Sequence, residues 1–336
     1  MLNEPWFLLL LGAFLIGSVL LAVHHAEVIA HRVGEPFGTL VLAISVTIIE
    51  VALIVTSMLS QSPGSELVAR DTVFSAVMIV ANGIVGLCIF LGGLKHKEMA
   101  FKVDGNKSAF AVLIALATFS LVMPVFTITT PGPDFSKSQL AFAGIASLVL
   151  YGAFLFFQTV THRHYFLHIS TDDFPEEIGH NEVPSNIKTA TSLLILLISL
   201  CLVVGLAKLL SPAIEAGIAH MGAPKSVLGV AIASLVLLPE GFTAIKAALA
   251  NRLQNSLNLA LGSALASIGL TIPAVAAIAI YFSMPLDLGI SNTGIIFLFL
   301  TFFIGTLTLG TGRATVLQGV VHLIIFFEFL FLSLVP

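Results

Sequence analysis

The stretch LVLAISVTIIEVALIVTSML, residues 40–59, is apolar apart from a few hydroxyls and one carboxylate near its centre, Glu50. About twenty apolar residues suffice for a helix to cross the hydrocarbon core of a bilayer, so this stretch predicts a membrane-spanning helix. A charge at that depth costs about 2.5–3.5 kcal/mol even on the mildest insertion scales, and such residues commonly mark ion or proton sites. Glu50 is therefore the first candidate functional residue.

A second stretch repeats this layout. Residues 227–250 read VLGVAIASLVLLPEGFTAIKAALA and carry their own central acid, Glu240. Each stretch is introduced by a Gly-x-Pro step, at residues 34–36 and 222–224. Two mid-membrane glutamates in matching halves of the chain predict one shared site.

The composition fixes the broad class. The chain has 336 residues, of which 57% are hydrophobic and only 10% charged, so it predicts a multi-pass membrane protein. A net charge of −4 with scattered basic residues gives no reason to expect a nucleic-acid partner. Cys88 and Cys201 fall in apolar spans and are interpreted as small core residues, not as a disulfide or metal site. The N-terminus lacks a basic region and a cleavage site, so it is interpreted as a retained first helix.

Segmentation by apolar runs predicts an all-α protein with ten transmembrane helices, separated by polar or turn-like residues. The predicted spans are 6–24, 36–60, 72–94, 108–128, 138–160, 189–210, 225–250, 255–282, 291–310 and 314–335. The one long polar break, 161–188, is acidic and rich in histidine. Because five spans is an odd number, a second five-span unit must enter from the opposite side. The sequence thus predicts two inverted five-helix repeats, 1–160 and 189–336, joined by a hinge at 161–188.

The basic residues predict the orientation. Ten of the fourteen fall on one side of the predicted topology and four on the other, and the richer side is expected to be cytoplasmic. The four are Arg70, Lys137, Lys208 and Lys225. Both termini are then expected outside and the hinge in the cytoplasm, in a bacterial inner (plasma) membrane. The sequence leaves open whether the chain forms a homo-oligomer.

Several polar residues could complete a site around the two glutamates. Thr47 lies three residues before Glu50, and Thr243 three after Glu240. The third span places Ser75, Asn82, Gly86 and Gly93 on one helical face, and the eighth does the same for Ser263, Ser267 and Thr271. Pro239 is expected to break its helix and free carbonyl oxygens. Hard oxygen ligands suit calcium, or sodium or potassium where fewer ligands engage. The expected metal ligands are Glu50 and Glu240, with transported ions and protons as the partners and no cofactor.

Structural interpretations compete at each position. A lone intramembrane glutamate can simply pair with a neighbouring donor, and Asn82 and Ser267 can serve helix packing alone. Glu328 in the last span is interpreted as structurally paired. His24, His25, Glu27 and His31 are interpreted as a solvated helix end after the first span. The hinge, with His162, His164, His168 and His180, is either a solvated acidic loop or a cation-sensing or pH-sensing site.

Several function classes are disfavoured. The sequence contains no H-E-x-x-H, G-x-S-x-G or P-loop motif, which argues against a protease, a hydrolase and an ATP-driven pump. The chain is therefore not expected to be an enzyme. Inverted halves with paired acids favour a secondary antiporter over a passive cation channel, which would need a filter motif, and over a membrane scaffold.

Four runs carry a family resemblance, at 23–54, 69–86, 237–273 and 310–323. They include the Pro-Glu-Gly step at 239–241 and the run GSALASIGLTIP at 262–273. The sequence resembles the bacterial ChaA-type cation/proton antiporters of the calcium/cation antiporter superfamily. This resemblance implies proton-driven export of calcium, or of sodium or potassium in some members. It also implies that Glu50, Glu240, Asn82 and Ser267 line the ion path. The Gly-Asn motif that precedes each glutamate in the better-known exchangers is absent here.

Overall fold

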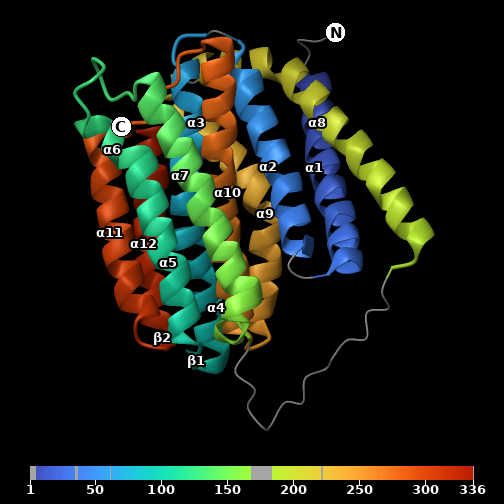
Figure 1. Cartoon of the computed structure of the whole chain (residues 1–336), viewed down its shortest axis with the longest axis vertical. Helices are drawn as coiled ribbons and strands as arrows, with labels where there is room; N and C mark the ends of the chain where they lie inside the picture. The colour runs from blue at the N-terminus through green and yellow to red at the C-terminus, as the bar shows by residue number, and fades with distance from the viewer. Residues whose placement is uncertain (1–4, 35–36, 61, 168–183, 221, 336) are drawn as a thin grey trace.

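The computed structural model describes residues 5–34, 37–60, 62–167, 184–220 and 222–335, which form a bundle of long helices (Figure 1). Ten helical segments of this described part are long and apolar enough to cross a membrane. In the first half they are α1 (Pro5–Val33), α2 (Phe37–Met58), the third span, the fourth span and α7 (Lys137–Phe156). In the second half they are α8 (Asn186–His220), α9 (Ser226–Leu249), α10 (Leu253–Phe282), α11 (Asn292–Leu309) and α12 (Val316–Leu334). The prediction of ten transmembrane helices is confirmed.

The third and fourth spans are composite. The third contains η1 (Ser65–Leu67), α3 (Val68–Met78), the π-helix η2 (Ile79–Ile84) and α4 (Val85–His96). The fourth contains α5 (Val103–Ala117), the π-helix η3 (Thr118–Val122) and α6 (Met123–Phe126). A π-helix η4 (Phe157–Thr161) and a 3₁₀ turn η5 (Arg163–Tyr165) follow α7.

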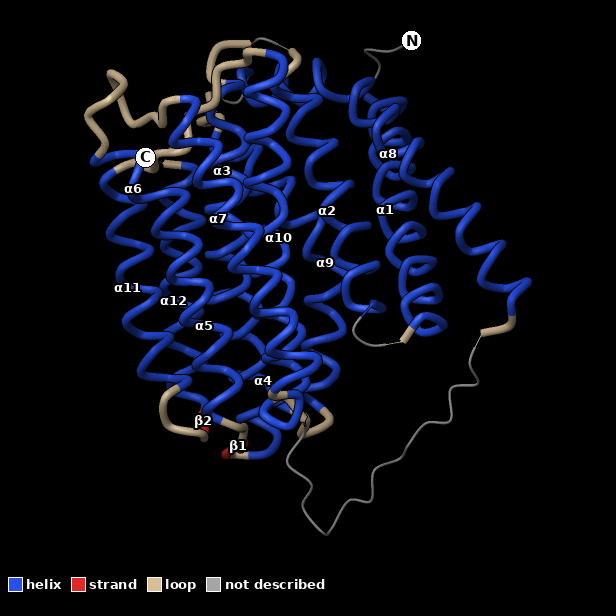
Figure 2. Tube along the Cα trace, viewed as in Figure 1, coloured by secondary structure: helices blue, strands red, loops and turns tan. Residues whose placement is uncertain are grey.

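The packing relates the two halves to each other. The second helix of each half packs on the third span of the other, since α2 contacts α10 and α3 contacts α9. In the same way α10 packs on α5 and α7, while α4 and η2 pack on α12. The helices α1 and α8 pack on each other along one edge of the bundle (Figures 1 and 2). The fold is two inverted five-helix repeats.

A short antiparallel ladder marks one end of the bundle, which we call the strand end (Figure 2). Strand β1 (Glu98–Ala100) follows α4 and pairs with β2 (Arg313–Thr315), which precedes α12. Met99 faces Ala314 in this ladder, and both side chains are buried. Glu98 and Arg313 form an exposed ion pair of 3.3 Å, which contributes little to stability. The ladder therefore connects the third and tenth spans mainly through backbone bonds and two buried side chains.

The turns and helix starts follow from local chemistry. Gly34 and Gly222 precede α2 and α9 with φ angles of +73° and +64°, a left-handed conformation that glycine adopts without steric cost. Thr315 and Gln318 form a reciprocal capping box that starts α12, as Ser136 and Gln139 do for α7. The glycines of the two Gly-x-Pro steps thus occupy matching positions in the two repeats.

Three details differ from the sequence predictions. The helix α1 continues to Val33, so the histidine strip belongs to it, and His25 Nδ1 lies 3.1 Å from Ser192 Oγ of α8. The helix α9 continues through Pro239, which creates no break. Both cysteines are free, but only Cys88 is a core residue because Cys201 is exposed.

The third span contains the π-helix η2, and a π-turn inserts one extra residue relative to an α-helix. Ser75, which precedes η2, lines a cavity together with Phe329, Leu332 and Ser333 of α12. Asn82 Oδ1 lies 3.1 Å from His322 Nδ1 of α12, and Gly86 and Gly93 lie against His322 and Val316 of the same helix. The four residues predicted to share one face therefore all lie towards α12.

Candidate functional site

Glu50 lies in the middle of α2 and is 1% exposed. Ser267 Oγ of α10 donates to its carboxylate, at 2.7 Å from Oε1 and 2.9 Å from Oε2. Thr271 Oγ1, one helical turn further along α10, donates to Oε2 at 2.9 Å. Because residues four apart share a helix face, α10 presents both hydroxyls to one carboxylate. Such donors offset part of the cost of burying a charge.

Glu240 lies at the matching place in α9 but has a different environment. It is 7% exposed, and its Oε2 has no hydrogen-bond partner among the described residues. The side chain lines a cavity of about 110 Å³ between α2, α7, α9 and α10. At about 30 Å³ per water, this space would hold three or four water molecules. Because its side chain lines this cavity, Glu240 is the more accessible acid of the pair, and its buried Oε2 is left without a donor among the described residues.

The cavity lies on the strand side of Glu240. Among its lining residues are Gln158, which follows α7, and Asn258 in the first two turns of α10. Asn258 Nδ2 donates to the carbonyl of Phe166, and Asn258 Oδ1 accepts from Gln254. Gln254 in turn accepts from the backbone of Lys102, which lies just after β1. This chain of bonds connects the cavity wall to the strand end.

The two glutamates flank the same part of α10. Ala266 lines the Glu240 cavity, and its neighbour Ser267 binds Glu50. A cation or a proton bound between the two glutamates would neutralise the charge that burial in this part of the bundle disfavours.

Asn82 is fully buried in η2 but contacts neither glutamate. Its Nδ2 donates to Thr301 Oγ1 of α11 at 2.8 Å, and its Oδ1 lies 3.1 Å from His322 Nδ1 of α12. His322 Nε2 lies 3.1 Å from Thr308 Oγ1 of α11. The structure thus places Asn82 in a separate buried polar network.

The two candidate threonines also bond away from the glutamates. Thr47 donates to the carbonyl of Ala43 and lines an apolar groove between α2 and α10. Thr243 is exposed and donates to the carbonyl of Pro239. Of the six candidate residues, the structure brings Glu50 and Ser267 into contact and places Glu240 beside them, whereas Asn82, Thr47 and Thr243 lie elsewhere.

Sequence reasoning missed His322, Thr301 and Thr308 as members of a buried network. A histidine inside an apolar span was the available signal, because an unpaired imidazole would be costly there. Glu328 is exposed on α12 and has no hydrogen-bond or ion-pair partner that the structure describes, so its predicted structural pairing is not observed.

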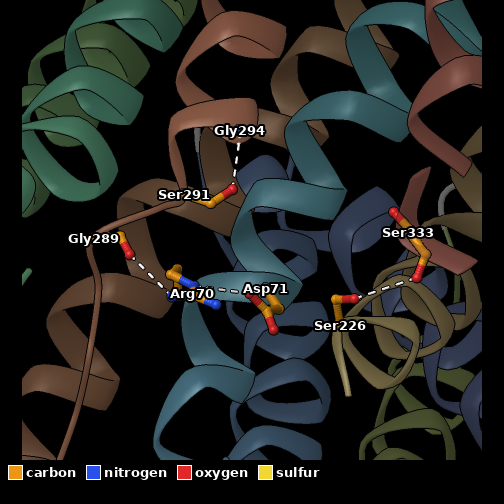
Figure 3. A network of polar contacts seen from close by, with 7 residues as sticks. All are labelled: Arg70, Asp71, Ser226, Gly289, Ser291, Gly294 and Ser333. Carbon is orange, nitrogen blue, oxygen red and sulfur yellow. Dashed lines mark hydrogen bonds and ion pairs between the residues drawn. The ribbon is translucent and has the colours of Figure 1, made fainter. Parts of the chain in front are cut away.

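A second cavity, of about 430 Å³, lies at the opposite end of the bundle, where α3, α9 and α11 begin and α12 ends. Arg70 and Asp71 form an ion pair of 2.8 Å in its wall, and Arg70 also donates to the carbonyl of Gly289 (Figure 3). Neither glutamate lines this cavity. Of these two cavities, the one on the strand side is lined by a glutamate of the pair, and the one at the opposite end is not.

The described residues contain no group of three or more His, Cys, Asp or Glu side chains placed to hold a metal. Within the hinge, His162 stacks on Phe157, whereas His168, His180 and the acidic residues between them lie outside the described residues. The sensing hypothesis for the hinge stays a prediction.

The sequence profile described as "sodium/calcium exchanger protein" matches residues 4–160 and 191–335, which cover nearly all of both repeats. This chain belongs to that family. The y4hA protein of Sinorhizobium fredii strain NGR234, named provisionally as an ionic transporter, is 53% identical over 98% of this chain and 89% of its own length. The sodium-potassium/proton antiporter ChaA of Escherichia coli K12 is 34% identical over 94% of this chain and 85% of its own. The resemblance to ChaA-type antiporters is confirmed.

Solved structures support the same fold. The structure of native YfkE superposes with a TM-score of 0.75 at 17% identity, covering 98% of this chain and 92% of YfkE. The structure of the H⁺/Ca²⁺ exchanger CAX superposes with a TM-score of 0.70 at 13% identity, covering 96% of this chain and 80% of CAX. At these identities the likeness concerns the fold.

Proposed function

We propose that this protein is a proton-coupled cation antiporter that works by alternating access. The observation that carries the proposal is the contrast between two buried carboxylates at matching positions of inverted repeats. Glu50 is closed by two hydroxyl donors, whereas Glu240 lines a cavity and has one buried oxygen without a partner among the described residues. A buried carboxylate must be neutralised by a proton or by a cation, so the two compete for the same oxygens. Competition at a site open to one side at a time is sufficient for exchange.

Calcium is the proposed cargo. Calcium takes six to eight oxygen ligands, and the pair offers four carboxylate oxygens with the hydroxyls of Ser267 and Thr271 close by. A monovalent cation is the alternative, because fewer of these ligands would satisfy sodium or potassium. The names of relatives support both, since ChaA of E. coli is called a sodium-potassium/proton antiporter and a 24% identical protein of Aphanothece halophytica a Ca²⁺/H⁺ antiporter.

The proposed site comprises Glu50, Glu240, Ser267 and Thr271, with Asn82 entering in another state. Thr47 and Thr243 are not part of it, because Thr47 lines the apolar groove between α2 and α10 and Thr243 is exposed. We place the protein in a bacterial inner membrane with both termini outside and the strand end in the cytoplasm. The excess of basic residues at that end supports this orientation.

The test is cation-dependent collapse of a pH gradient in everted vesicles, with calcium, sodium and potassium added separately. Glu50→Gln and Glu240→Gln should each abolish the response while expression is preserved, because glutamine keeps the shape but cannot exchange a proton for a cation. The matched control is Glu328→Gln, which removes an intramembrane carboxylate outside the site and should leave exchange unchanged. Near-normal exchange by either site variant would refute the two-glutamate mechanism.

A further inference from the structure

Asn82 is bonded to α11 and α12, away from Glu240, whose Oε2 has no hydrogen-bond partner among the described residues. The segment η2 packs against α9 at this level, because the side chain of Ile84 lies 3.3 Å from where a Cβ on Gly241 would stand. Gly241 is the neighbour of Glu240. An unpaired acceptor and an amide donor therefore sit on touching elements, with the amide bonded on the far side.

The hydrogen bonds define how Asn82 is held. Its Nδ2 donates to Thr301 Oγ1, so its Oδ1 is the acceptor that faces His322. His322 Nδ1 must then carry the hydrogen, and a neutral His322 accepts at Nε2 from Thr308 Oγ1. Every polar atom of the Asn82 side chain thus has a partner on α11 or α12. The close approach of α12 depends on Gly86, where a Cβ would lie only 3.0 Å from the Cβ of His322.

Asn82 lies within the π-helix η2. One residue of an α-helix turns the chain by about 100°, so loss of the extra residue of a π-turn would re-aim the side chains within it. Ser267, the corresponding polar residue of the other repeat, lies in the uninterrupted α-helix α10 and reaches Glu50. The two repeats therefore differ here, because Ser267 is bonded to Glu50 whereas Asn82 is not bonded to Glu240.

We propose that His322 and Thr301 are positioning residues that hold Asn82 away from Glu240 while the strand-side cavity is present. In the opposite state, η2 becomes α-helical and Asn82 donates to Glu240 Oε2. This inference rests on the proposed function. The transfer gives Glu240 the kind of donor that Ser267 gives Glu50, so the two halves exchange roles.

The experiment measures the state directly, without transport. Ser263, which lines the Glu240 cavity, is replaced by cysteine in a chain whose Cys88 and Cys201 are alanine. The rate of labelling by an impermeant maleimide is then measured from the strand side. His322→Leu and Thr301→Val should each lower this rate about five- to tenfold, the population shift expected for one lost buried hydrogen bond. Thr306→Val, which removes an exposed α11 hydroxyl bonded to its own helix, should leave the rate unchanged.

A second comparison separates positioning from packing. In an Asn82→Leu background the amide is gone, so His322→Leu should have no further effect on labelling. His322→Asn, which can still donate to Asn82, should restore the rate and remains informative where His322→Leu does not fold. Unchanged labelling in both single variants, or an effect of His322→Leu that persists without Asn82, would overturn the inference. Exchange that survives Glu240→Gln would instead refute the proposed function, whatever the labelling rates show.

Discussion

Removing the Ser267 hydroxyl should make the proton a stronger competitor for Glu50. The hydroxyl contacts both carboxylate oxygens, at 2.7 and 2.9 Å, and so favours the ionised form. A hydrogen bond to a charged group contributes about 1.5–3 kcal/mol. The lower end applies here, because a protonated Glu50 could donate back to Ser267 and recover part of the bond. About 1.4 kcal/mol is a factor of ten, so we expect Ser267→Ala to lower apparent calcium affinity about tenfold at acidic pH.

The pH dependence gives this prediction its sign. Since the variant holds its proton more tightly, the cation needs a higher pH to displace it, and the affinity curve should move to higher pH. The difference in calcium affinity between Ser267→Ala and the unmodified protein should shrink at a pH at which Glu50 is ionised in both. The assay is calcium binding to purified protein across pH 6 to 9, with Thr306→Val as the control hydroxyl deletion. An affinity deficit of the same size at every pH would show that Ser267 acts only as a cation ligand or in packing, and equal affinities would remove it from the site.

Three further predictions concern other parts of the molecule. Gly229→Ala should lower the melting temperature in detergent, because its Cβ would lie 2.5 Å from the backbone carbon of Asp71. The control Gly205→Ala, whose Cβ would have nothing within 4 Å, should leave the melting temperature unchanged. Equal melting temperatures in the two variants would contradict the α3–α9 packing. Single cysteines at Ser185 and Pro131 should react with an impermeant reagent from opposite sides of the membrane, and labelling of both from one side would contradict the inverted arrangement. Partial burial and the neighbouring Asp134 raise the pKa of Asp287 to about 6. Because this folded-state pKa exceeds the ordinary pKa of an aspartate, the folded protein should gain stability as the pH falls from 7 towards 4. The Asp287→Asn variant should lose that gain, whereas the exposed Asp104→Asn control should keep it. A pH dependence of the melting temperature that persists in Asp287→Asn would assign the gain to another group.

The number and type of spans could be predicted because the bilayer sets a minimum length for every apolar helix. The central acids stood out for the same reason, as the rare charges within those lengths. The ends of the helices were less predictable. The polar strip after residue 24 was interpreted as a solvated helix end, and His24, Glu27 and His31 are exposed, but α1 continues through the strip to Val33 and contacts Ser192 of α8.

The details of the site depend on features that periodicity does not report. Thr243 follows Glu240 at a helical spacing, but a threonine hydroxyl can bond the carbonyl four residues earlier and so has no need of the site. Asn82 was singled out as a residue of the ion path, yet its amide bonds to Thr301 of α11 and His322 of α12. The spacing within the third span does not report which distant helices pack on it.

The β1–β2 ladder has a consequence for biogenesis. Its Glu98 and Arg313 are 215 residues apart, so the first strand is synthesised long before its partner exists. At about 5–20 residues per second, that interval lasts on the order of 10 to 40 s. During this time β1 presents unpaired backbone groups, which are prone to pair with other chains. Insertion of the first five helices therefore yields an incomplete intermediate, and the last helix closes the molecule only when its preceding strand reaches β1.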